Sequence, residues 1–136
     1  MQNYGVLDAS YQAAGGETGI RKLVDDFYQQ METQQRGKHI RAMHKDELGL
    51  IKDKLALFLM GWLGGPRNYA KKYGGISIPM VHKHLIINEE ERDAWLFCMG
   101  QALQYQDYEP EFKDYLLKQL AVPANRIMQV SQAAHA

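Results

Sequence analysis

The sequence has little of what marks secreted, membrane-spanning or zinc-binding proteins. It contains one cysteine among 136 residues, so no disulfide can form within it, and a lone thiol agrees with a reducing compartment. No segment approaches the roughly 18 unbroken apolar residues of a membrane span. The first sixteen residues lack the basic and apolar regions of a signal peptide. We therefore expect a cytoplasmic protein.

An excess of charge of either sign is also absent. Sixteen Lys and Arg residues balance sixteen Asp and Glu residues, which argues against nucleic acid or an anionic membrane as a partner. The sequence has no HExxH motif, no Cys/His spacing for structural zinc, no GxSxG elbow and no glycine-rich phosphate loop. The common templates for metal-dependent, nucleophilic and nucleotide-dependent enzymes are therefore not matched.

Apolar residues recur at helical spacing along most of the chain, and no run alternates as a strand would. The pattern predicts a short N-terminal helix within residues 1–14, a second helix over 20–31 and a third over 46–63. Gly15-Gly16 is expected to end the first, and Gly64-Gly65-Pro66 the third. The polar stretch 34–38 is expected to be a loop or helix end, and residues 67–79 mainly an extended loop.

Two further helices are predicted from their starting residues. Asn88 with Glu91 three positions later forms a capping-box signature, and the helix after it carries one stripe of Trp95, Cys98, Met99 and Ala102. Pro110 suits the first turn of a last helix. Pro123 is expected to kink or break that helix before Ile127, with a frayed tail over 131–136. The sequence thus predicts an all-α single domain, 1–136.

The histidines offer one metal-binding possibility. His82 and His84 lie two positions apart, so on a helix their side chains project about 200° from one another and cannot hold one ion together. Either can face the interior. A long loop leading to a histidine, the polar-tipped aromatics Tyr28 and Trp95, and the apolar helix 46–63 together permit a haem pocket, because one imidazole suffices to hold haem iron.

Four sequence elements carry a resemblance to a known family. They are FYQQM at 27–31, FLMGWLGGP at 58–66, ERDAWLFCM at 91–99, and a histidine thirteen positions before a tryptophan. In this order and spacing the chain resembles the group II truncated haemoglobins. The resemblance implies a truncated globin fold, a two-over-two helical sandwich around haem b.

The resemblance also implies a role for individual residues. His82 matches the proximal iron ligand, with His84 facing away, and the distal ligand-binding residues are Tyr28, His44 and Trp95. The implied haem pocket is lined by Phe27, Ile51, Leu55, Phe58 and Met99, and the implied propionate partners are Lys54 and Tyr69. Val81 replaces a basic residue that is frequent just before the proximal histidine, so one propionate contact is missing from the family pattern.

The function implied is binding of O2, NO and CO. Two or three distal hydrogen-bond donors would hold a partly negative ligand tightly, since each such bond contributes about 1.5–3 kcal/mol. We therefore expect protection against oxidative or nitrosative stress, with NO dioxygenase, peroxidase or peroxynitrite-isomerising chemistry and an unidentified electron donor, in a monomer or weak dimer. Oxygen storage or sensing and a haem-free helical interaction module are the alternatives. Tyr28 or His44 as a resting-state iron ligand is a further hypothesis.

Overall fold

The computed structural model describes residues 4–43, 47–74 and 85–135. Within these ranges the chain forms helices and connecting turns, with no strand, so the all-α prediction is confirmed. None of the helices in the described ranges has the length and hydropathy needed to cross a membrane. The helices are α1 (Ala9–Ala13), α2 (Gly16–Thr33), α3 (Gln35–Ala42), α4 (Leu48–Trp62), α5 (Asn68–Tyr73), α7 (Glu89–Leu103) and α8 (Pro110–Ala134).

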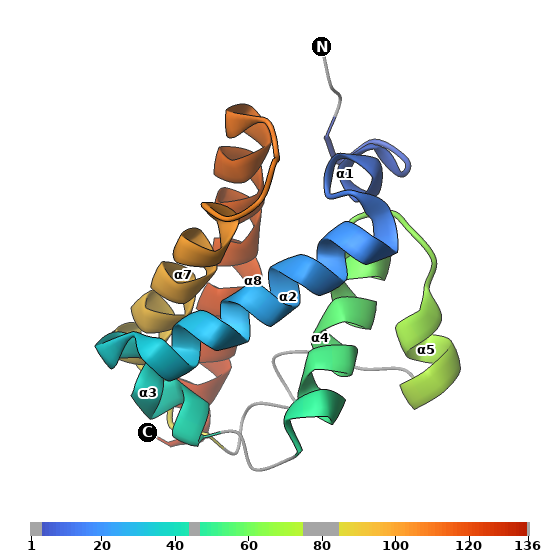
Figure 1. The fold of residues 1–136 in the computed structure, drawn as a ribbon. Helices are drawn as coiled ribbons and strands as arrows, with labels where there is room; N and C mark the ends of the chain where they lie inside the picture. The colour runs from blue at the N-terminus through green and yellow to red at the C-terminus, as the bar shows by residue number, and fades with distance from the viewer. Residues whose placement is uncertain (1–3, 44–46, 75–84, 136) are drawn as a thin grey trace.

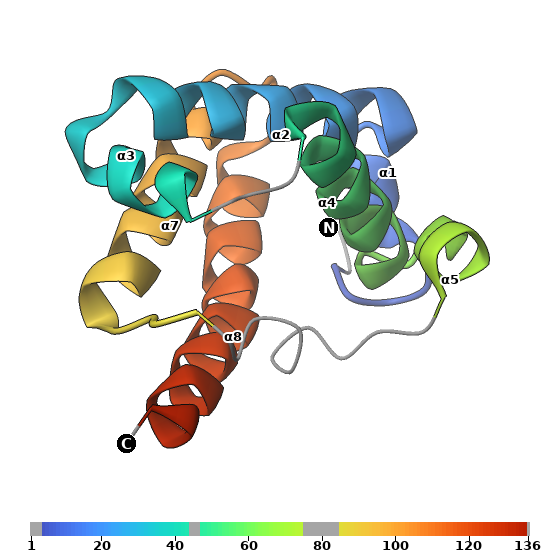
Figure 2. The same cartoon turned by 90° about the horizontal axis from the view of Figure 1, so that it is seen from below.

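Helix α2 crosses the molecule and joins its two sides (Figure 1). It packs against α4 on one side and against α7 on the other, while α7 packs against α8 and α3 packs against both α2 and α7. Figure 2 shows α4 and α5 together on one side beneath α2, with α7 and α8 on the opposite side. The core lies where these helices meet.

The periodicity of α2 places its apolar residues in that core. Ile20, Leu23, Val24, Phe27 and Met31 are all buried, as their spacing predicts. Gly15 precedes the helix with φ of 84°, a left-handed conformation that glycine adopts at little cost. The predicted break at Gly15-Gly16 is therefore confirmed.

The first helix is shorter than expected. Helix α1 begins only at Ala9, and Val6 and Leu7 precede it as exposed residues. Leu7 has φ of 51° and cannot belong to a right-handed helix. Val6 and Leu7 are apolar, but they do not extend the helical face of Tyr11, because both stay exposed to solvent.

The prediction of a loop or helix end over 34–38 is wrong for residues 35–38. Only Gln34 is extended, and α3 begins at Gln35. Gly37 is buried in α3, where an added Cβ would lie 2.6 Å from Met31 Cα and 2.9 Å from Cys98 Sγ. Because Gly37 has no side chain, α3 can pack closely against α2 and α7 at this point. This packing explains why a polar stretch that contains glycine is helical.

The prediction of a mainly extended loop over 67–79 is wrong in its first part. Residues 68–73 form helix α5, while 75–79 lie outside the described residues. Six residues are too few to show a helical period. Contacts with α4 stabilise this helix, since Tyr73 donates to Asp53 Oδ2 at 2.6 Å and Lys72 Nζ lies 2.8 Å from the same oxygen.

Of the kink or break predicted at Pro123, the break is wrong. Helix α8 runs from Pro110 to Ala134 with Pro123 inside it. Proline removes one backbone hydrogen bond, but apolar residues before and after it lie buried on one face, so their packing holds the helix together. These residues are Leu116, Leu120, Ala124 and Met128. The predicted role of Pro110 in the first turn is confirmed.

The predicted fraying from Ser131 is wrong as well. Ser131 is buried, and its hydroxyl donates to the Leu85 carbonyl at 2.6 Å and accepts from the Ile87 N–H at 2.8 Å. The last turns of α8 therefore hold the segment that leads into α7. The sequence also permits a short helix starting at Pro79 and running through Leu85, of which all but Leu85 lies outside the described residues.

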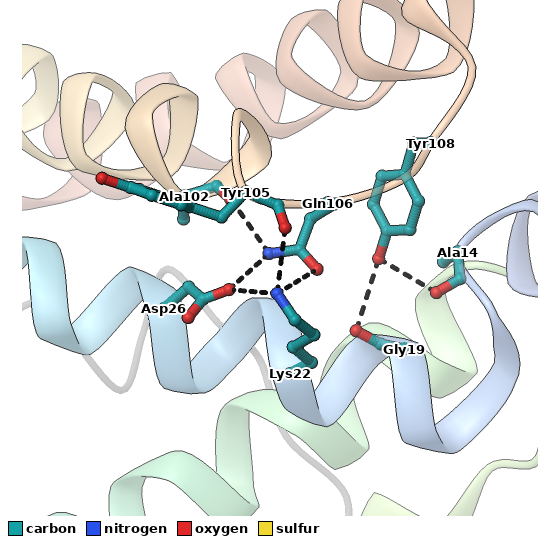
Figure 3. A network of polar contacts seen from close by, with 8 residues as sticks. All are labelled: Ala14, Gly19, Lys22, Asp26, Ala102, Tyr105, Gln106 and Tyr108. Atoms are coloured by element: carbon teal, nitrogen blue, oxygen red, sulfur yellow. Dashed lines mark hydrogen bonds and ion pairs between the residues drawn. The ribbon is translucent and has the colours of Figure 1, made fainter.

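A polar network ties the first half of α2 to the turn between α7 and α8 (Figure 3). The Gln106 amide donates to Asp26 at 2.7 Å and to the Ala102 carbonyl at 3.0 Å. Lys22 Nζ bonds Asp26 at 2.8 Å and the Tyr105 carbonyl at 2.9 Å. Gln106 is buried, so these bonds satisfy a side chain that would otherwise be costly to remove from water.

Candidate functional site

Three aromatic rings from α2 and α7 meet at the centre of the fold. Phe27 lies between the other two, with its ring centroid 5.1 Å from that of Tyr28 and 5.0 Å from that of Trp95. Both pairs are edge-to-face, at 62° and 66°, a favourable aromatic geometry. The structure thus brings together two of the predicted distal residues, Tyr28 and Trp95, and the predicted pocket residue Phe27.

Tyr28 is the most enclosed of the polar-tipped groups in this cluster. Only 4% of its surface is exposed, and burial raises its pKa well above that of a free phenol, with the nearby Arg41 acting weakly in the opposite direction. The hydroxyl therefore keeps its proton at all physiological pH values. A permanently protonated phenol can act as a hydrogen-bond donor toward the space beside it.

The start of α7 fixes the position of Trp95. The predicted capping box is present: the Asn88 side chain accepts from the backbone N–H of Glu91, and Glu91 Oε1 accepts from the Asn88 N–H at 2.8 Å. The carboxylates Glu89 and Glu90 fill the rest of the first turn, where the helix dipole favours negative charge. Trp95 follows two turns later, half-buried, and Met99 one turn beyond it is fully buried.

Helix α4 supplies an apolar wall. Ile51 is buried, and Leu55 and Phe58 are half-buried residues packed against the same core as Phe27 and Tyr28. Beyond them, Trp62 stacks on Phe58 at a centroid distance of 6.1 Å and is more exposed. Along this face of α4, burial therefore decreases from Ile51, which is buried, through Leu55 and Phe58 to the more exposed Trp62.

The predicted propionate partners come from different helices and are linked by a third residue. Lys54 on α4 places Nζ 5.4 Å from the centroid of the Tyr73 ring, a cation–π distance. Tyr69 on α5 has its ring centroid 5.2 Å from that of Tyr73. Partial burial raises the pKa of Tyr69. Lys54 and Tyr69 therefore lie on the same edge of the molecule, with Tyr73 between them.

Asp53 at this edge was missed by the sequence reasoning. Its carboxylate accepts from Arg21 at 3.1 Å, from Lys72 at 2.8 Å and from Tyr73 at 2.6 Å. The bonds from Lys72 and Tyr73 are the main causes that lower the pKa of Asp53 to about 2. In the sequence, Asp53 stands out as a single acid between Lys52 and Lys54. Its hydrogen-bond partners, however, come from α2 and α5, so the sequence alone did not indicate them.

The predicted histidines are not placed by this structure, because His44, His82 and His84 lie outside the described residues. In the described part of the chain no group of three or more His, Cys, Asp or Glu side chains is arranged to hold a metal ion. The described residues fit a haem, which needs apolar walls, cations at its propionate edge and a single imidazole from the protein. Helices α2, α4 and α7 provide the walls, and Lys54 the cation.

Comparisons with known proteins agree with this architecture. The model of the bacterial-like globin family matches residues 9–129. The group 2 truncated haemoglobin YjbI of Bacillus subtilis is 29% identical over 127 residues, which cover 93% of each chain.

Solved structures of truncated haemoglobins have the same fold. A cold-adapted truncated haemoglobin from the Antarctic bacterium Pseudoalteromonas haloplanktis is 29% identical with a TM-score of 0.83, covering 88% of this chain and 96% of that one. The group II 2-on-2 haemoglobin of Agrobacterium tumefaciens is 28% identical with a TM-score of 0.81, covering 93% and 97%. The predicted two-over-two fold is therefore confirmed. The chain belongs to the bacterial-like globin family, within the group II truncated haemoglobins, which implies haem as its cofactor and diatomic gases as its ligands.

Proposed function

We propose that His82 holds the haem iron and that Tyr28 and Trp95, with His44, form a polar distal side that binds diatomic ligands tightly. The observation that carries this proposal is the Tyr28–Phe27–Trp95 cluster, in which two polar-tipped aromatics from facing helices flank one buried ring. Phe27 and Met99 fix the cluster from the core side. Leu55 and Phe58 supply the apolar wall opposite, and Lys54 and Tyr69 bind the propionates.

Haem supplies an iron that binds diatomic ligands and changes its oxidation state. The protein's contribution is to aim donors at the ligand and to keep water away. The Trp95 indole N–H can only donate, and the Tyr28 hydroxyl, which can also accept, keeps its proton available to donate because burial raises its pKa. Each hydrogen bond to a partly charged acceptor contributes about 1.5–3 kcal/mol, or roughly ten- to a hundredfold in affinity.

Tight binding suits protection better than delivery. A carrier must release its ligand readily, whereas a protein that consumes NO, peroxide or peroxynitrite benefits from donors that hold and polarise the reacting oxygen. We therefore infer a role in oxidative or nitrosative stress protection in the cytoplasm, with electrons from a separate donor. Oxygen storage or sensing would use the same pocket and is the second candidate.

Two histidine variants test the proposal. With His82→Ala, we expect loss of stable haem binding and of the Soret band, because the proposed proximal bond to the iron is removed. With His84→Ala, matched in chemistry and two positions away, haem binding should persist. If the two results are exchanged, His84 is the ligand and the assignment is wrong.

The stress-protection role is tested by turnover. The haem-loaded protein with a reductase and NO in the presence of O2 should consume NO catalytically and produce nitrate. Rapid oxygen dissociation with no NO turnover would instead support storage or sensing.

A further inference from the structure

Charge is distributed unevenly across this electrically neutral chain. Residues 48–73, which form α4 and α5, carry five Lys and Arg residues and one Asp, a net charge of +4. Residues 89–114, which form α7 and the start of α8, carry eight Asp and Glu residues and two cations, a net charge of −6. Figures 1 and 2 show these helices on opposite sides of α2. Positive charge is therefore concentrated over α4 and α5, the basic face, and negative charge over α7 and the start of α8, the acidic face, where Arg36, Lys38 and Arg41 of α3 offset part of it.

Part of the basic face is not neutralised by its neighbours. Arg21, Lys52 and Lys72 pair with Glu17, Asp25 and Asp53 respectively. Lys54, Arg67 and Lys71, by contrast, form no ion pair with any described residue. Arg67 and Lys71 are exposed. Lys54 is the proposed partner of a haem propionate, so the positive charge left to face solvent over α4 and α5 is that of Arg67 and Lys71.

The basic face is also hollowed. A cavity of about 360 Å³ between α2, α4 and α5 is lined by Glu17, Arg21, Asp53, Leu57, Asn68, Lys71 and Lys72. Arg21 and Lys72 are paired with Glu17 and Asp53, so Lys71 is the cation of this lining left to meet a carboxylate on a partner surface.

This face includes the proposed propionate edge of the haem site. Lys54 and Tyr69, the proposed propionate partners, belong to the same two helices, and Tyr73 connects them to the Asp53 cluster. A redox partner seated here would therefore lie beside the proposed propionate edge. This step rests on the proposed function, since it takes the propionate edge from that proposal.

We propose that the α4–α5 face is the docking surface for an acidic electron-donor protein, an iron–sulfur protein or flavoprotein with a carboxylate-rich surface. One electron passes from the reduced donor to ferric haem iron, leaving the donor oxidised and the iron ferrous, with no bond made or broken. A compact protein fits better than a nucleic acid or membrane, because an extended polyanion would also meet the acidic face of α7.

The test compares two double variants with the same change in net charge. Arg67→Glu with Lys71→Glu reverses two exposed charges on the basic face, and Lys118→Glu with Arg126→Glu reverses two exposed charges on α8. None of these four residues contributes to the proposed haem site. Stopped-flow spectroscopy follows reduction of the ferric haem protein by dianionic ferrous EDTA, by dicationic hexaammineruthenium(II), and by photoreduced ferredoxin as an acidic protein probe.

For the wild type we expect reduction by the two anionic donors to be fast at low ionic strength and to slow as salt screens the face. The Arg67/Lys71 variant should lose about tenfold in rate with both anionic donors at low salt, and gain with the cationic complex. The Lys118/Arg126 variant should stay within about twofold of the wild type. Binding of CO, a neutral ligand, should be the same in all three proteins.

Equal slowing in both variants would show that only net charge matters and would overturn the proposal. So would rates with ferredoxin that do not depend on salt. Failure of the haem assignment is seen separately, because a protein without a Soret band is identified before any reductant is added.

Discussion

The first half of helix α2 is joined to its neighbours by polar contacts, whereas its second half is joined to them by aromatic rings. In the first half, Lys22 and Asp26 bond Gln106, and Arg21 bonds Asp53. In the second half, Phe27 and Tyr28 pack edge-to-face with each other and with Trp95. The first half is held by hydrogen bonds to its neighbours, and the second half brings the rings of Phe27 and Tyr28 against Trp95.

Two tyrosines show the difference most directly. Burial raises the pKa of both Tyr108 and Tyr28. Tyr108 donates its hydroxyl to the Ala14 carbonyl at 2.9 Å, with the Gly19 carbonyl at 3.4 Å, so it joins the start of α2 to the α7–α8 turn. Tyr28 belongs to the proposed ligand-binding cluster. The same group thus has a structural role at one end and a proposed ligand-binding role at the other, and substitutions should separate the two.

Gly19→Ala should have the largest effect, and on stability alone. A Cβ at this position would lie 2.0 Å from the Ala14 carbonyl oxygen, so the start of α2 must shift, at a cost of about 3 kcal/mol. Urea unfolding of the haem protein measures this. The control is Gly100→Ala in α7, where the nearest atom is at 3.7 Å and alanine should be neutral or stabilising. Faster oxygen dissociation in Gly19→Ala would show that the two halves are coupled.

Tyr28→Phe should act mainly on the ligand. Loss of one donor should speed oxygen dissociation by about ten- to a hundredfold, the equivalent of 1.5–3 kcal/mol. Stopped-flow oxygen displacement by CO measures the rate. Trp95→Phe should act in the same direction, and an unchanged rate in that variant would mean that Tyr28 supplies the bond alone.

Tyr108→Phe makes the same chemical change as Tyr28→Phe at the opposite end of α2. Removal of the donor to the Ala14 carbonyl should cost about 1 kcal/mol of unfolding free energy. Oxygen dissociation should not change. A change in that rate comparable to the one in Tyr28→Phe would remove the distinction between the two halves.

Asp53→Asn should have the smallest effect, and a pH-dependent one. The pKa of Asp53 is lowered to about 2 by its donors, so its contribution to stability is present above the ordinary carboxyl pKa near 4 and is lost as the pH falls from about 4 to 2. Solvent screening of Lys72 reduces this contribution to about 1 kcal/mol. Unfolding at pH 7 and pH 2 measures it: the variant should be less stable at pH 7 and match the wild type at pH 2.

The sequence predicted well those features that one helix determines by itself. The buried face of α2 follows from spacing alone, and the capping box of Asn88 and Glu91 from two residues of one turn. These in turn fixed where Phe27, Tyr28 and Trp95 lie within their helices. That α2 and α7 bring the three together came from the family resemblance rather than from periodicity.

The features that the sequence missed depend on contacts between helices. Gly37 is helical because it lets α3 approach Met31 and Cys98 closely. Helix α5 depends on Asp53 of α4. Pro123 stays within a helix because residues on both sides of it are buried. In each case the local sequence favoured a loop or a break, and contacts between helices outweighed that preference. Such contacts join residues far apart in the chain, so a short stretch of sequence does not reveal them.

The buried hydroxyl of Ser131 bears on the order of folding events. Its bonds to Ile87 and Leu85 span 44 and 46 positions of sequence, so the segment before α7 is fixed only after α8 has docked. Contacts of long sequence separation form late, because the chain must first lose the entropy of closing the loop between them. Residues 85–87 should therefore become ordered late in folding, when the end of α8 docks against them.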